Sequence, residues 1–322
     1  MGINRNGQQW HTRRRMLNKI FLRSSPQHDE VFKEVVEDVL ERWRGFSRTG
    51  SGVLPGLERE LYNWSVESLG MLIFGRRLGC VRGASMNEFV QCVQKIFVES
   101  AKMTIIPPKM AYTLGLPVWF RFMKAADRAL ELAREYVVGN LRNQTGILAE
   151  MLQEKDISEE EIVRIVVDLF LAAADTTSHS TQWSLYLLSK NPECQERLYE
   201  EIRGLGGVDL DNMPYVRAVV KEALRLYPVA PFLTRFTTND LELAGFHIPK
   251  GKLLLMSLFA TSRDPRYFQD PLAFRPERWL GALPQPDAAS CHYASIPFGV
   301  GPRGCIGRRV AEKQMHLLLS KV

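Results

Sequence analysis

The stretch PFGVGPRGCIGRR, residues 297–309, surrounds one cysteine with glycines and basic side chains. Its spacing is F-x-x-G-x-R-x-C-x-G, formed by Phe298, Gly301, Arg303, Cys305 and Gly307. A metal-bound thiolate needs backbone N–H groups directed at its sulfur, and glycine permits the close approach and the unusual φ angles that this requires. A helix that begins after the cysteine would add positive dipole, and Arg303 can reach an anionic group on the same ligand. The stretch therefore indicates a cysteine that ligates a cationic centre. The alternative is a buried structural cysteine.

Composition limits the class of protein. The chain has 322 residues and is 45% hydrophobic, which is enough for a large core. Its formal net charge of +6 suits an acidic protein partner or an anionic membrane surface and is too small for a nucleic-acid binder. The five cysteines show neither a CxxC pair nor zinc spacing, so a disulfide framework is not expected. No apolar run reaches the ~18 residues of a membrane span.

Helical periodicity dominates the chain. It predicts helices over 30–43, 57–74 and 118–144. A capping box of Ser158 and Glu161 opens a long helix that we expect to run to about Lys190. Further helices are predicted over 192–204 and from 214 to a stop at Pro228. Strand signals occur only over 241–258, which predicts two short strands around turns at Gly245 and Gly251.

Four ordered motifs resemble those of one family. PFGVGPRGCIG is similar to the heme-ligand loop of the cytochrome P-450 family, and AAADTT (172–177), EALR (222–225) and FRPERW (274–279) resemble three further signatures in the family's order. The resemblance covers essentially the whole chain. It implies a mainly α, cytochrome P-450-like helical fold with small β-sheets, a single domain over 1–322, and heme b bound through Cys305. It also implies a heme-dependent monooxygenase that uses O2.

Asp175 and Thr176 lie in the middle of an otherwise apolar helix. A carboxylate there is costly unless it is paired or solvated, and the small side chains of Ala172 and Ala173 leave room for a ligand against the helix. A hydroxyl and a carboxylate beside a cavity can pass protons to bound dioxygen, which is the role that the resemblance favours. The alternative is that Thr176 bonds the carbonyl one turn back and that Asp175 has a surface partner. The family commonly has glycine where Ala173 stands, and we expect this difference to narrow the groove in which dioxygen would bind.

Glu222 and Arg225 are three residues apart on a helix and can form an ion pair. The resemblance implies that they form a buried trio with Arg278. We expect this trio to be structural, because it would stabilise the core behind the cysteine loop.

Heme carries two propionates, which require fixed hydrogen-bond donors. Trp10 and Arg14 are one turn apart on one helical face, and the resemblance implies that this face meets a propionate. It assigns the same kind of contact to Arg235. The alternative for Trp10 is an ordinary amphipathic anchor, and the alternative for Arg14 is that Arg13 or Arg15 makes the propionate contact instead.

Basic residues indicate a branch of the family. Arg308 and Arg309 in CIGRRVAE resemble the mitochondrial branch, whose members receive electrons from an acidic [2Fe-2S] ferredoxin and its reductase. Arg217 and Lys221 resemble the ferredoxin-docking positions of that branch. The alternative is that these are ordinary exposed basic side chains. The branch implies a location in the mitochondrion, with peripheral association at the inner membrane.

Members of that branch mostly hydroxylate sterols, steroid hormones or secosteroids. The expected substrate wall is apolar and would suit a steroid ring system; it comprises Leu169, Ala172, Val229, Ala230 and Phe232. Two rival functions stay open. One is a heme-thiolate isomerase or dehydratase, whose members tend to lack the acid–threonine pair, and the other is an inactive truncated heme-binding fragment. Compared with the family, the chain lacks segments at both ends, so we expect the polypeptide as written to fold poorly.

Overall fold

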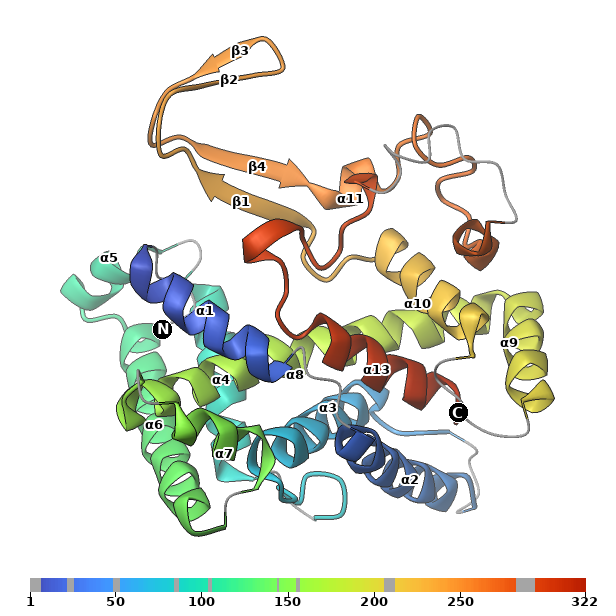
Figure 1. Ribbon diagram of the computed structural model, residues 1–322, viewed down its shortest axis with the longest axis horizontal. Helices are drawn as coiled ribbons and strands as arrows, with labels where there is room; N and C mark the ends of the chain where they lie inside the picture. The colour runs from blue at the N-terminus through green and yellow to red at the C-terminus, as the bar shows by residue number, and fades with distance from the viewer. Residues whose placement is uncertain are drawn as a thin grey trace. The chain divides into compact units, whose positions relative to one another are not determined.

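A computed structural model of the protein describes residues 7–21, 26–48, 53–83, 87–103, 106–143, 145–154, 157–205, 212–281 and 293–322. Within these residues the fold is mainly helical, with two small two-stranded sheets (Figure 1). The chain forms two compact units. Unit 1 comprises Met1–Ser178, Arg309–Leu317 and Lys321–Val322, and unit 2 comprises His179–Arg308 and Leu318–Ser320. The single domain expected over residues 1–322 stays a prediction.

Unit 1 consists of helices whose apolar faces pack together. They are α1 (Gln8–Phe21), α2 (Pro26–Arg48), α3 (Leu57–Phe74), α4 (Glu88–Lys102), α5 (Pro108–Thr113), α6 (Pro117–Asn143), α7 (Gly146–Gln153), the first part of α8 (Glu159–Lys190) and most of α13 (Arg308–Leu319). Helix α4 packs against α6, while α2 and α7 pack against α3. The helices predicted over 30–43, 57–74 and 118–144 are confirmed as α2, α3 and α6.

An aromatic cluster joins four of these helices. The Phe170 ring of α8 lies 5.6 Å from Phe74 of α3 and 5.0 Å from Phe89 of α4, measured between ring centroids. Tyr136 of α6 stacks on Phe74 at 4.7 Å. Each such pair contributes about 0.5–1.5 kcal/mol beyond the burial of its surface. The cluster therefore fixes α8 just before the AAADTT segment.

The start and the end of α8 follow the sequence prediction. Glu161 donates its backbone N–H to the Ser158 hydroxyl at 3.3 Å, which is one half of the predicted capping box. The Glu161 carboxylate forms an ion pair with Arg13 of α1. The helix then continues without interruption to Lys190, as predicted.

Unit 2 contains shorter elements. They are α9 (Pro192–Gly204), α10 (Pro214–Leu226), β1 (Phe232–Phe236), β2 (Leu241–Leu243), β3 (Phe246–Ile248), β4 (Leu253–Ser257), α11 (Leu258–Thr261) and the 3-10 helices η1 (Pro276–Leu280) and η2 (Gly301–Arg303). Helices α9 and α10 begin at prolines and end where the sequence predicted. Helix α10 packs against η1.

The strand prediction was wrong in number. Residues 241–258 hold three strands rather than two, and β1 was not predicted. β1 pairs antiparallel with β4, with Phe232 opposite Ser257, and β2 pairs antiparallel with β3. The predicted turns at Gly245 and Gly251 are present between these strands. Strand β1 was missed because it is defined by its hydrogen bonds to β4, which follows it by about twenty residues, and not by a pattern in its own sequence.

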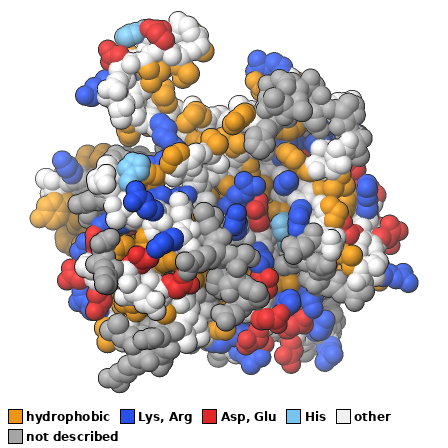
Figure 2. Space-filling model, in the orientation of Figure 1, with side chains coloured by type: hydrophobic (Ala, Val, Ile, Leu, Met, Phe, Trp, Pro, Cys, Tyr) orange, Lys and Arg blue, Asp and Glu red, His pale blue; other side chains and the backbone are white. Residues whose placement is uncertain are grey.

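These strands expose much apolar surface. Phe236 and Phe246 are 70% and 73% exposed, and Leu253 and Leu255 are also exposed. Figure 2 shows hydrophobic side chains along the arm formed by the strands, at the upper left. Among the described residues, no helix combines the length and the apolar character that crossing a membrane requires.

Candidate functional site

The Cys305 loop, residues 297–307 of unit 2, is held by short backbone hydrogen bonds. The Cys305 N–H donates to the Phe298 carbonyl at 2.7 Å, and the Gly304 N–H donates to the Gly301 carbonyl at 2.9 Å. Gly299 and Gly301 have φ angles of 68° and 72°, in the left-handed region that is unfavourable for residues with a Cβ. Helix α13 begins three residues after the cysteine, as the sequence predicted. The backbone therefore turns tightly around one thiol.

The loop fits a thiolate ligand of heme iron. The Cys305 side chain is exposed, which favours a ligand over a buried structural cysteine. A Cβ at position 307 would lie 4.0 Å from the Cys305 sulfur, and Gly307 leaves that space open. Among the described residues, no group of three or more His, Cys, Asp or Glu side chains could hold a metal ion. A lone thiolate suits a metal whose other ligands come from a cofactor, so Cys305 would hold the iron.

The trio of Glu222, Arg225 and Arg278 is in contact and buried. Arg225 donates two hydrogen bonds to the two oxygens of the Glu222 carboxylate, at 2.7 and 2.8 Å. Arg278 donates to the same carboxylate at 3.1 Å. Glu222 and Arg225 are 0% exposed and Arg278 is 5% exposed. Burial lowers the pKa of Arg278, while the charge of Glu222 acts in the opposite direction. The trio therefore keeps charged groups in the interior of unit 2 by mutual pairing.

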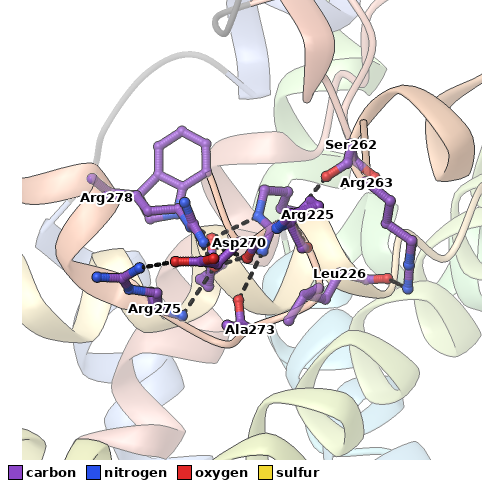
Figure 3. Close-up of polar contacts among 11 residues, drawn as sticks. Arg225, Leu226, Ser262, Arg263, Asp270, Ala273, Arg275 and Arg278 are labelled. Atoms are coloured by element: carbon purple, nitrogen blue, oxygen red, sulfur yellow. Dashed lines mark hydrogen bonds and ion pairs between the residues drawn. The ribbon is translucent and has the colours of Figure 1, made fainter. Parts of the chain in front are cut away.

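Arg225 also ties α10 to the coil that follows the sheets. Its guanidinium donates to the backbone carbonyls of Ser262 and Pro271, each at 2.7 Å, and of Ala273 at 3.1 Å (Figure 3). These bonds satisfy carbonyl groups that form no regular secondary structure. Arg225 thereby holds residues 262–273 against α10.

Asp270 is the second anchor of this coil. Its φ of 46° is in the left-handed region, which aspartate tolerates better than most residues. Arg278 donates to its backbone carbonyl at 2.8 Å, and Arg275 pairs with its carboxylate at 2.6 Å (Figure 3). The two arginines of FRPERW therefore hold one unusual backbone turn.

Sequence reasoning missed two further groups that bind Glu222. The Trp279 indole N–H donates to its carboxylate at 3.0 Å, and the backbone N–H of Arg275 donates to it at 3.0 Å. Trp279 is the last residue of the quoted FRPERW segment. Its indole N–H could have been suspected, because a largely buried tryptophan usually finds an acceptor.

The AAADTT segment lies on α8 in unit 1. The Thr176 hydroxyl donates to the Ala172 carbonyl at 2.9 Å, which is the alternative that the sequence left open for this side chain. Ser65 of α3 donates to the Ala173 carbonyl at 3.4 Å and links this turn to α3. Asp175 is half-buried. Proton delivery by Asp175 and Thr176 stays a prediction.

The residues expected near the propionates lie in different units. Trp10 is 8% exposed on α1 of unit 1, where its ring meets His11 edge-on at 4.8 Å. Arg14, one turn further on α1, is half-buried. Arg235 lies on β1 of unit 2, is exposed, and donates to the Thr234 carbonyl at 2.7 Å. Their contacts with heme stay predictions.

The basic residues expected at the ferredoxin face are accessible. Arg217 is half-buried and Lys221 is exposed on α10, where the Lys221 ammonium lies 5.8 Å from the Trp279 ring centre. Arg308 and Arg309 are exposed at the start of α13, and the Arg308 guanidinium lies over the Phe298 ring at 5.5 Å. Arg303 of the loop is also exposed.

The residues expected to form the substrate wall differ in exposure. Leu169 is buried and Ala172 exposed on α8. In unit 2, Val229 is half-buried, Ala230 is exposed, and Phe232 is 47% exposed at the start of β1. Their joint role in binding a substrate stays a prediction.

Comparison with known protein families matches residues 2–322 to "Cytochrome P450". The chain belongs to the cytochrome P450 family, as the four motifs predicted. Membership implies a heme held by a cysteine thiolate. A solved structure titled "Crystal structure of cytochrome P450DA heme domain" superposes with a TM-score of 0.83 at 20% identity, covering 98% of this chain and 70% of that one. The predicted mainly helical fold with small sheets is therefore confirmed.

Several curated relatives of the chain are named as mitochondrial proteins. The chain is 35% identical to "25-hydroxyvitamin D-1 alpha hydroxylase, mitochondrial" of Mus musculus, over 98% of this chain and 67% of that protein. It is 34% identical to "Cytochrome P450 315a1, mitochondrial" of Drosophila melanogaster and to "Sterol 26-hydroxylase, mitochondrial" of Rattus norvegicus. Each match covers 98% of this chain and, respectively, 63% and 64% of the relative. The chain thus spans about two thirds of the length of these proteins.

Proposed function

We propose that this protein is a heme-thiolate monooxygenase that hydroxylates a steroid or sterol-like lipophilic substrate with O2. The observation that carries the proposal is the Cys305 loop, in which glycine turns present one exposed thiol. Relatives named as sterol and vitamin D hydroxylases support the substrate class.

Different residues of the chain would have different roles in the reaction. The bound heme would supply oxygen activation, and Cys305 would hold its iron through the thiolate. The trio of Glu222, Arg225 and Arg278 would keep the core behind the loop rigid. The Asp175 carboxyl would hold and release a proton at its side-chain oxygen, with the Thr176 hydroxyl beside it. For Thr176 to donate to a ligand, its hydroxyl must turn away from the Ala172 carbonyl.

Electrons would come from an acidic [2Fe-2S] ferredoxin and its reductase. Arg217 and Lys221 on α10 offer accessible positive charge, and a basic patch steers an acidic partner. The names of the relatives support a mitochondrial location. Peripheral association with the inner membrane is part of the proposal.

The thiolate assignment is tested with a Cys305→Ser variant of the heme-loaded protein. The wild type, reduced and treated with carbon monoxide, should give the absorption band of a thiolate-ligated ferrous complex, and the variant should lose it. Cys92→Ser is the matched control, because Cys92 is a half-buried cysteine on α4. Survival of the band in Cys305→Ser would end the proposal.

The activity is tested on a panel of sterols, steroids and secosteroids, with purified ferredoxin, its reductase and NADPH. We expect hydroxylated product that depends on both proteins and on O2. Turnover of a lipid peroxide without any reductase would instead favour a heme-thiolate isomerase or dehydratase. Heme binding without turnover of either kind would favour a non-catalytic heme-binding protein.

A further inference from the structure

Tyr62 on α3 is a buried tyrosine to which the proposed function assigns no role. It is 4% exposed, and its hydroxyl makes no hydrogen bond within the part of the chain that the structure describes. A buried hydroxyl without a partner destabilises the folded state, because it loses its hydrogen bonds to water. Phenylalanine would fill the same space without this penalty. A hydroxyl at such a position therefore points to a role other than stability.

The neighbourhood of Tyr62 is the segment of α8 that carries the acid–threonine pair. Ser65, one turn after Tyr62 on α3, donates to the Ala173 carbonyl of α8 at 3.4 Å. Residues three apart lie on one side of a helix, so Tyr62 and Ser65 share a side of α3. Asp175 follows Ala173 by two residues. Tyr62 therefore lies beside the turn of α8 that holds Asp175.

The charge of Asp175 acts on Tyr62. Burial raises the pKa of the Tyr62 phenol, and negative charge at Asp175 and at Cys80 raises it further. Burial also raises the pKa of the Cys80 thiol to about 12, so this thiol is neutral at pH 7. Asp175 is thus the neighbouring acidic side chain toward which the Tyr62 hydroxyl can donate a hydrogen bond.

We propose that Tyr62 is a positioning residue for Asp175, whose carboxylate accepts a hydrogen bond from the Tyr62 hydroxyl when substrate is bound. This inference rests on the proposed proton-delivering role of Asp175. Catalytic hydrogen bonds are often long in the ligand-free protein and tighten in the substrate complex. A hydrogen bond from Tyr62 would fix the orientation of the Asp175 carboxylate. Fixing this orientation speeds proton transfer but does not change how tightly the substrate binds. The hydroxyl therefore affects kcat and leaves KM unchanged.

The test compares Tyr62→Phe, Asp175→Asn and the double variant in the heme-loaded protein, with ferredoxin, reductase and a turned-over substrate. The measurements are kcat, KM, product formed per NADPH consumed, and the melting temperature. We expect Tyr62→Phe to lower kcat about fivefold, which corresponds to one ordinary hydrogen bond, and to lower the product yield per NADPH. KM should not change, and the melting temperature should stay equal or rise. In the Asp175→Asn background, Tyr62→Phe should have no further effect.

Ser68→Ala is the matched control. Ser68 is also on α3, is fully buried, and has a hydroxyl without a hydrogen bond to any described residue. Its removal should leave kcat and the product yield unchanged. If Asp175→Asn lowers kcat while Tyr62→Phe does not, or if the two effects are independent, the inference on Tyr62 is overturned and the proposed function stands. If Asp175→Asn leaves kcat unchanged, the proton-delivering role fails and the inference fails with it.

Discussion

Among the described residues of unit 2, Glu222 is the carboxylate that pairs with both buried arginines, Arg225 and Arg278. Its carboxylate accepts hydrogen bonds from Arg225, Arg278, the Trp279 indole and the backbone of Arg275. Two guanidinium groups are thereby neutralised in part by one carboxylate at 0% exposure. Burial of a charged group is costly unless the group is paired. The negative charge of Glu222 is therefore required to keep the two arginines in the interior.

Replacing Glu222 by glutamine should destabilise the protein strongly. Two guanidinium groups would stay buried without a counter-charge, for which a loss of about 3–5 kcal/mol in the free energy of unfolding is expected. The measurement is urea denaturation followed by circular dichroism. Glu88→Gln is the control, because the exposed Glu88 carboxylate pairs with Arg128 at 2.8 Å, and an exposed pair contributes little to stability. Equal losses in the two variants would refute the role of the trio.

At the scale of elements, one carboxylate links α4 to α6. Glu99 of α4 is 5% exposed and pairs with Lys102 at 2.9 Å on its own helix and with Arg121 of α6 at 3.2 Å. The hydrogen bond from Lys102, followed by the pairing with Arg121, lowers the pKa of Glu99. The packing of these two helices is therefore sensitive to acid.

The direction of this pH dependence follows from the lowered pKa. The unfolded chain takes up the proton at a higher pH than the folded protein does, so the stabilisation by Glu99 is complete above the unfolded value of about 4.3. It is lost as the pH falls through the folded value. Glu99→Gln should therefore make the loss of unfolding free energy between about pH 5 and pH 3 less steep.

The measurement for Glu99 is urea denaturation at a series of pH values. Glu131→Gln is the control, because it removes an equal charge from an exposed position on α6. If both variants change the slope alike, the effect comes from net charge and the assignment to the Glu99 pairs is wrong.

At the scale of the whole molecule, the chain carries a formal net charge of +6 and would meet an acidic electron donor. Reversing charge in Arg217→Glu and Lys221→Glu should weaken ferredoxin binding about tenfold or more and reduce its dependence on salt. Binding is measured by titration at several ionic strengths. Lys95→Glu on α4 is the control, with the same change in net charge per substitution. Equal weakening by Lys95→Glu would indicate general electrostatic attraction instead of docking at α10.

Local chemistry made much of this fold predictable. Helix limits were set by residues within one turn of each end, such as Ser158 at the start of α8 and Pro214 at the start of α10. The glycines around Cys305 indicated the tight loop in the same way, because φ preference belongs to the single residue. The four motifs then identified the family, since each motif is a short continuous segment.

Tertiary structure decided the features that join distant segments. Strand β1 exists through its pairing with β4, and the Trp279 indole reaches Glu222 across 57 positions. The hydrogen bond from Ser65 of α3 to the Ala173 carbonyl of α8 has no signal in the sequence around either residue. Capping and helical periodicity act over about four residues and can be read along the chain, whereas burial and long-range hydrogen bonds depend on how the elements pack.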